Sequence, residues 1–108
     1  MPGTIIRVTM FKIPSEESRA KLVEYYKTLV TTAVKDGAPY IVSLQAGPLI
    51  EDPRSAGFTF AAKSEFKTVE DMKYYDEGCE AHQALKEKAK PLGVEGMMMV
   101  YYDPVVVA

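Results

Sequence analysis

One short segment of the chain, residues 66–82, carries the side chains best suited to chemistry. It holds the only histidine, His82, and the only cysteine, Cys79, together with Tyr74 and Tyr75. An unperturbed histidine has a pKa of about 6.5, so it exchanges a proton near neutral pH. The pattern predicts His82 as a general base and Tyr75 or Tyr74 as hydrogen-bond donor to a carbonyl oxygen that becomes negative.

Each of these residues also has a structural interpretation. His82 shares a helical stripe with Leu85 and Ala89, so it faces the interior, either as a hydrogen-bonded core residue or as a pocket base. The tyrosines fit equally well as packed aromatic residues with their hydroxyl groups at the surface. In a continuous helix, Tyr75 and His82 would lie about 10.5 Å apart along the axis, too far for direct contact. A break at Gly78 leaves that distance open.

Metal binding is not expected at this segment. Cys79 and His82 have a spacing that two ligands of one metal can have, but a zinc site needs three or four protein ligands. No further histidine or cysteine exists. A nucleophilic Cys79 activated by His82 is an alternative, against the ordinary role of a small buried cysteine. No convincing phosphate-binding glycine motif is present.

The elements that position this segment follow from periodicity and capping signals. Ser15 with two following glutamates predicts a helix start, and Thr68 with Asp71 has the form of a capping box. Prolines and glycines separate the apolar periodic stretches. The predicted elements are a strand at 4–13, a helix at 16–34, a strand at 40–46, a loop at 47–57, a strand at 58–66, a helix at 69–75, a helix at 79–90 and a strand at 95–102.

This order is βαββαβ, the ferredoxin-like arrangement of an α+β fold. We predict one domain over residues 1–108, in which a four-stranded antiparallel sheet has its helices on one face. In the strand at 40–46, alternation places Tyr40, Val42, Leu44 and Ala46 on one side and Ile41, Ser43 and Gln45 on the other. Arg7 and Thr9 belong to a polar set, with Ser43, Gln45 and Lys63, that could share one sheet face. The set could supply polar contacts in a cavity or hydrogen bonds across a dimer, and the interface use is favoured.

The second sheet face has largely apolar or mixed character, which favours a homodimer formed by two sheets face to face, a dimeric α/β barrel. The formal net charge of −2, with lysines interleaved among acidic residues, argues against nucleic acid as a partner. No apolar run is long enough to cross a membrane. A single cysteine among 108 residues fits a reducing compartment, so a cytoplasmic location is expected.

Four stretches together resemble one known family. They are residues 8–13, residues 66–75, the pair Ala81 and His82, and residues 100–104. In order and spacing, they are similar to the stress-responsive dimeric α/β-barrel domain family, called Dabb, over nearly the whole chain. The resemblance implies a homodimer in which each subunit has a cavity between sheet and helices, with no metal or organic cofactor.

The resemblance also covers, in part, a plant polyketide cyclase of that family. That member uses a histidine and a tyrosine of the corresponding segment in an intramolecular aldol condensation. The likeness implies that Tyr26 is a cavity wall residue. Here the interval from Tyr75 to His82 is one residue longer than in the cyclase, and Ile5 stands where the cyclase has a second histidine.

These observations predict a cofactor-independent pocket protein, a lyase or cyclase acting on an apolar or aromatic carbonyl compound. His82 and Tyr75 are the expected catalytic residues, and Tyr26, Arg7, Tyr74 and Cys79 the expected substrate-binding residues. The alternative is a non-catalytic, stress-associated homo-oligomer, which predicts a cavity filled by side chains. A monooxygenase of a neighbouring barrel family is disfavoured, because the chain has no tryptophan and His82 is the only imidazole available for haem iron.

Overall fold

The computed structural model describes residues 4–108, so Met1, Pro2 and Gly3 of the predicted domain lie outside the described part. The chain forms the predicted βαββαβ order. Its elements are β1 (Ile5–Lys12), α1 (Glu16–Thr32), β2 (Ile41–Pro48), a 3-10 helix η1 (Pro53–Ser55), β3 (Phe60–Phe66), α2 (Val69–Glu77), α3 (Glu80–Ala89), a 3-10 helix η2 (Lys90–Leu92) and β4 (Gly96–Tyr102).

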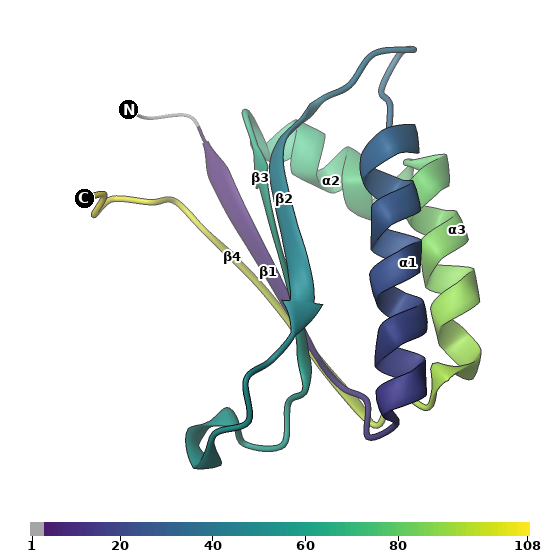
Figure 1. Ribbon diagram of the computed structural model, residues 1–108. Helices are drawn as coiled ribbons and strands as arrows, with labels where there is room; N and C mark the ends of the chain where they lie inside the picture. Colours follow the sequence, from purple (N-terminus) through teal and green to yellow (C-terminus); the bar gives the residue numbers. More distant parts are fainter. Residues whose placement is uncertain (1–3) are drawn as a thin grey trace.

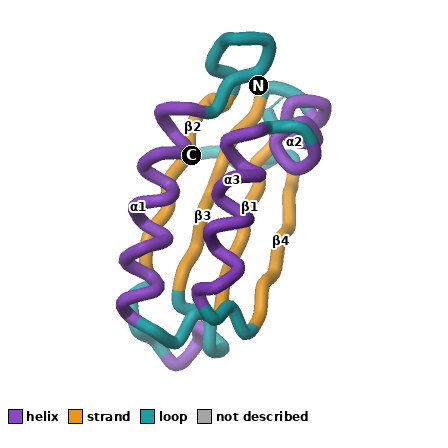
Figure 2. The backbone as a smooth tube through the Cα atoms, turned by 90° about the vertical axis from the view of Figure 1, so that its right-hand side faces the viewer, coloured by secondary structure: helices purple, strands orange, loops and turns teal. Residues whose placement is uncertain are grey.

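The four strands form one antiparallel sheet in the order β2-β3-β1-β4. The long helices α1 and α3 lie on one face of this sheet, with α2 at one end (Figure 1). The α+β ferredoxin-like prediction is therefore confirmed. In Figure 2, α1 and α3 lie in front of β2, β3 and β1, while β4 stays to one side of α3. The helix-facing side of β4 is thus left largely uncovered.

Capping residues set the ends of the helices as predicted. The Ser15 hydroxyl accepts a hydrogen bond from the Ser18 amide, and the Thr68 hydroxyl accepts one from the Asp71 amide. Each replaces a partner that the first turn of a helix lacks. Between sheet and helices lies an apolar core whose fully buried side chains include Leu22, Leu29, Phe60, Phe66 and Tyr75.

The predicted faces of the strand at 40–46 were wrong at its start, because β2 carries an irregularity. Its register on β3 shifts between Ile41 and Ser43, as in a β-bulge. Ile41 and Leu44 both pack against the core, and Val42 is 46 % exposed. The extra residue turns Ile41 to the helix side, where simple alternation had placed Val42.

The polar set proposed for one sheet face is divided between the two faces. Arg7 lies opposite Ser64 and Thr9 opposite Ala62, all on the buried, helix-facing side. Ser43 and Gln45 pair with Glu65 and Lys63 on the other side. The prediction that Arg7 and Thr9 share an interface with these residues was therefore wrong, and both become available to the region beneath the helices.

The second face of the sheet carries no helix in residues 4–108 (Figure 1). Along β4, Met98, Val100 and Tyr102 are 45 %, 46 % and 48 % exposed. They stand beside Met10, Val8 and Ile6 of β1 in the strand register. This apolar strip is hereafter called the open sheet face.

Within residues 4–108, no helix is long and apolar enough to cross a membrane.

Candidate functional site

A cavity of about 480 Å³ lies between the helix-facing side of β1 and β4 and the inner side of α3. Its polar wall is supplied by seven side chains: Arg7, Thr9, Tyr26, Asp76, His82, Lys86 and Lys90. Its other wall is apolar and includes Met97 and Met99 of β4. The volume falls in the range of small-molecule sites, roughly 300 to 1,000 Å³.

A second hollow is larger, about 950 Å³, and lies between the start of α1 and the segment that joins β2 to β3. None of the side chains predicted for chemistry lines it. Its arginine, Arg19, donates hydrogen bonds to the carbonyl groups of Ile13 and Pro14, which close the turn before α1. The smaller cavity at His82 is the candidate functional site because the proton-transfer groups converge there.

His82 reaches this cavity because the chain breaks between α2 and α3. The amides of Gly78 and Cys79 both donate to the Tyr74 carbonyl, at 2.7 and 2.9 Å, which closes α2. The chain then turns into α3 at Glu80, and His82 lies in its first turn. The imidazole stacks on the Tyr75 ring with 3.7 Å between centroids and 13° between planes. The helix break thus brings into contact two residues that a continuous helix would separate.

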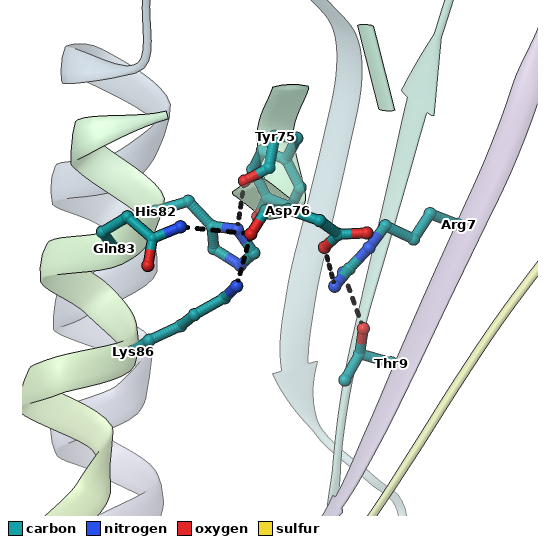
Figure 3. A network of polar contacts seen from close by, with 7 residues as sticks. All are labelled: Arg7, Thr9, Tyr75, Asp76, His82, Gln83 and Lys86. Atoms are coloured by element: carbon teal, nitrogen blue, oxygen red, sulfur yellow. Dashed lines mark hydrogen bonds and ion pairs between the residues drawn. The ribbon is translucent and has the colours of Figure 1, made fainter. Parts of the chain in front are cut away.

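One hydrogen bond determines which ring nitrogen of His82 carries the proton. Nδ1 lies 2.7 Å from the backbone carbonyl oxygen of Tyr75 (Figure 3). A carbonyl oxygen only accepts, so Nδ1 must be the protonated nitrogen of the neutral ring. Nε2 then holds the free lone pair, and it is the nitrogen left for a ligand in the cavity. This is the tautomer that a general base needs.

Burial keeps the ring neutral. His82 is only 3 % exposed. Desolvation is the main cause that lowers its pKa from 6.5 to about 4, and the positive charges of Arg7 and Lys86 act in the same direction. The hydrogen bond to the Tyr75 carbonyl and the charge of Asp76 oppose this shift. At neutral pH the imidazole is an unprotonated base of low basicity.

Arg7 is the charged centre of the polar wall. Its Nη2 lies 2.6 Å from Oδ1 of Asp76, and its Nη1 donates to the Thr9 hydroxyl at 2.7 Å (Figure 3). Its guanidinium carbon lies 5.1 Å from the centre of the Tyr75 ring. Arg7 is 7 % exposed, and its Nε is buried without a hydrogen-bond partner among residues 4–108. The pair connects β1 to α2 beside the base.

The tyrosines take different places around His82. Tyr26 lines the cavity, and burial raises its pKa to about 12, so its hydroxyl stays protonated and able to donate. Tyr75 is 1 % exposed, stacks on His82 and packs at a tilt against Phe66. Burial raises the pKa of Tyr75 as well. Tyr26 borders the space for a ligand. Tyr75, expected to donate to a substrate oxyanion, does not line the cavity and supports the imidazole from behind.

Two predicted substrate-binding residues lie elsewhere. The Tyr74 hydroxyl donates to the Val34 carbonyl, and its ring packs edge-on against Tyr40. Cys79 is fully buried in the core and unpaired. Neither residue lines the cavity at His82. Tyr74 lies two residues before Asp76, so it points to another side of α2, and Cys79 points into the core. The expectation that they contact substrate there was therefore wrong.

Lys86 belongs to the polar wall, although its sequence context had not singled it out. Its Nζ donates to the backbone carbonyl of Asp76 at 2.7 Å, and the Gln83 amide donates to the same oxygen at 3.1 Å. The sequence feature that could have identified Lys86 is its position four residues after His82, because residues four apart lie on one side of a helix. Among the residues described, no three histidine, cysteine or acidic side chains are grouped to hold a metal ion.

Comparison with known proteins agrees with this architecture. A solved hydroxynitrile lyase from Passiflora edulis superposes with a TM-score of 0.75 at 17 % identity, covering 95 % of this chain and 94 % of that one. A dimeric ferredoxin-like protein of unknown function from Jannaschia sp. CCS1 gives 0.73 at 15 % identity, covering 93 % and 98 %. At these identities the likeness shows the fold alone.

Sequence comparison goes further. A fusaristatin A biosynthesis cluster protein of Gibberella zeae (strain ATCC MYA-4620 / CBS 123657 / FGSC 9075 / NRRL 31084 / PH-1) is 41 % identical over 98 residues, which are 91 % of this chain and 71 % of that protein. Residues 5–103 match the family model described as Stress responsive A/B Barrel Domain. The chain therefore belongs to the Dabb family of stress-responsive A/B barrel domains.

Proposed function

We propose that this protein is a cofactor-independent acid–base lyase or cyclase that acts on an apolar or aromatic carbonyl compound. The observation that carries the proposal is the Nδ1 contact of His82 with the Tyr75 carbonyl, 2.7 Å long, because it leaves Nε2 as a free base at the cavity. The cavity of about 480 Å³ supports a ligand-binding role over the non-catalytic alternative, which predicts filled space.

In the cyclase form, Nε2 of His82 takes a proton from the carbon beside a carbonyl group. The electron pair moves onto the carbonyl oxygen, and the resulting enolate attacks a second carbonyl carbon of the same molecule. A carbon–carbon bond forms, and the new alkoxide takes the proton back from His82. The guanidinium of Arg7 and the hydroxyl of Tyr26 are placed to stabilise the transient oxyanion.

In the lyase form, Nε2 takes the hydroxyl proton of a hydroxynitrile, the bond to the cyanide carbon breaks, and the proton leaves with cyanide. Both forms use one base and one oxyanion. A histidine with a pKa of about 4 abstracts only weakly held protons well. We therefore propose substrates with an activated proton, such as a carbon between two carbonyl groups.

The relatives support this class of chemistry. One solved neighbour is a hydroxynitrile lyase, and the 41 % identical relative is a biosynthesis cluster protein for fusaristatin A. We further propose a role for Tyr75 in which it fixes the imidazole by stacking and by its carbonyl. The reaction needs only side chains of this chain. We place it in the cytoplasm, where a free Cys79 stays reduced.

The test uses the keto–enol conversion of 1-phenylbutane-1,3-dione, followed by its ultraviolet absorbance, with cleavage of mandelonitrile as the lyase arm. The protein should accelerate at least one of these reactions, and His82→Gln should lose the acceleration by a factor of about 100 or more, as expected for a general base. Lys88→Met, on the exposed side of α3, serves as the control and should match wild type. Equal rates for His82→Gln and wild type would remove the acid–base role.

We also propose that the chain forms a homodimer through the open sheet face. The exposed strip of Met98, Val100 and Tyr102 is apolar, and the solved neighbour from Jannaschia is dimeric. Two such strips packed together would remove both from water, which is the main driving force for association. The helix-facing cavity lies on the other side of the sheet and stays accessible in such a dimer.

A further inference from the structure

The polar wall of the cavity has an uncompensated positive charge. Arg7 and Asp76 neutralise each other at 2.6 Å, and His82 is neutral at pH 7 because its pKa is lowered to about 4. Lys86 donates only to the backbone carbonyl of Asp76. Within residues 4–108, no carboxylate lies within ion-pair distance of Lys86. Lys86 therefore brings one unpaired positive charge to the wall that holds the base.

The other lysine of the lining, Lys90, is paired with Glu87 at 2.8 Å. The opposite wall is apolar. Val94, Met97 and Met99 line the cavity there, and Met97 is 62 % exposed, so this apolar side reaches the surface beside β4. Methionine side chains are flexible and adapt to ligands of varied shape. The cavity thus offers a cationic end and an adaptable apolar end, a combination that matches an amphipathic anion.

From this arrangement we infer that the substrate is a carboxylate with an apolar chain or ring, its carboxylate bound by Lys86 and its apolar part against Val94, Met97 and Met99. The inference rests on the proposed function, since it names the substrate class of the same site. One unpaired charge matches a monoanion. A phosphate monoester carries about two negative charges at neutral pH and would need a second unpaired positive charge to match it.

The spacing of Lys86 and His82 also limits where the reacting atom lies. The two residues are four apart on α3, just over one helical turn, or about 6 Å along the axis. Both side chains also line the same cavity. The inferred substrate is therefore an oxo acid whose carboxylate meets Lys86 while its activated carbon meets His82.

Lys86 also has a structural role that the test must separate. Its bond to the Asp76 carbonyl caps the last turn of α2, where a positive charge is favourable. In Lys86→Met, the Gln83 amide still occupies that carbonyl. Lys86→Arg retains the charge. Lys88→Met removes the same charge from the same helix outside the cavity and is the matched control.

The experiment measures binding of octanoate, octan-1-ol and octyl phosphate to the full chain at pH 7 by NMR titration. Wild type and Lys88→Met should bind octanoate at least tenfold more tightly than octan-1-ol, and no more weakly than octyl phosphate. Lys86→Met should lose that preference while binding octan-1-ol as before, and Lys86→Arg should keep it.

Equal affinity of wild type for octanoate and octan-1-ol, or an unchanged preference in Lys86→Met, would overturn the inference. Tighter binding of octyl phosphate would overturn the assignment to a carboxylate. If Lys86→Met binds neither probe, Lys86→Arg decides, because a retained preference supports the inference and a lost one contradicts it. The three probes bind but do not react, so the binding experiment is independent of catalysis. Equal rates for His82→Gln and wild type would refute the proposed acid–base function and would leave the binding result unchanged.

Discussion

At the scale of single residues, the protonation state of His82 decides what the site can do. Its Nδ1 is committed to the Tyr75 carbonyl and its ring to the Tyr75 face. Burial lowers its pKa to about 4, so the base is unprotonated throughout the physiological range. In the unfolded chain the imidazole is in water and its pKa is about 6.5, so the shift on folding makes the stability of the protein depend on pH.

Stability should therefore fall with acidification. The folded pKa of His82 lies below the unfolded one, so the unfolded chain takes up the proton first. The part of the free energy of unfolding that depends on His82 is fully present above pH 6.5 and is lost as pH falls toward 4. Between pH 7.5 and 5, the free energy of unfolding should drop by about 2 kcal/mol from this residue alone. Urea unfolding at both pH values measures the drop.

The control for this prediction is His82→Gln, which cannot titrate. Its free energy of unfolding should change less over the same interval, since the remaining difference comes from the carboxylates that both proteins share. An equal drop in the two proteins would show that His82 has an ordinary pKa.

The sequence could predict which residues carry the chemistry of the site better than it could predict where their side chains point. His82, Arg7 and Tyr26 line the cavity, and their roles in binding and catalysis stay predictions. Tyr74 and Cys79 do not line it. Tyr74 lies on another side of α2 from Asp76, and the direction of Cys79 depends on how the chain turns at Gly78, which no periodicity specifies. Lys86 was missed because a lysine on a helix is usually solvated, and its role depends on a carbonyl of the preceding helix.

At the scale of elements, the ion pair of Arg7 with Asp76 holds β1 against the last turn of α2. The two residues are 69 positions apart in sequence. Their side chains are 8 % and 21 % exposed, so the pair is largely shielded from water. Because the next residues after Asp76 lead to His82, this contact sets the position of the α2–α3 break relative to the sheet.

A double-mutant cycle measures this contact. Arg7→Met should lower the free energy of unfolding by about 3 kcal/mol, because it leaves the Asp76 carboxylate partly buried and unpaired. Adding Asp76→Asn should recover part of that loss, since a neutral amide is less costly to leave unpaired. Urea denaturation of the four proteins gives the coupling free energy. A coupling near zero would mean that the pair behaves as a solvated surface contact.

The element order could be read from the sequence, while local irregularities could not. Pro14, Gly78 and the capping residues Ser15 and Thr68 end or start elements where expected. The bulge after Ile41 was not predicted, since it inserts one residue without glycine or proline to mark it. A period of two continued through the bulge assigns the wrong face, which is how Val42 was placed on the same side as Leu44.

At the scale of the whole molecule, the open sheet face is the largest feature that the single chain leaves unexplained. Apolar side chains of β4 are about half exposed there, and the helices cover only the other face (Figure 1). Sequence patterning predicted an apolar second face but not the extent of its exposure, which depends on a partner.

Val100→Glu should convert the proposed dimer to a monomer, because a charge at the middle of the apolar strip is costly to bury. Val30→Glu is the matched control, since Val30 is 53 % exposed on α1, and it should remain dimeric. Sedimentation equilibrium distinguishes the two states. A wild-type monomer at micromolar concentration, or a dimeric Val100→Glu, would contradict assembly through this face.

The central claim is that His82 is a neutral base protonated on Nδ1. The chain has a single histidine, so protein labelled with ¹⁵N-histidine gives one imidazole spin system, and its nitrogen shifts report tautomer and pKa directly. We predict the Nδ1–H tautomer at pH 7 and a titration midpoint near 4. An Nε2–H tautomer, or a midpoint near 6.5, would contradict the account.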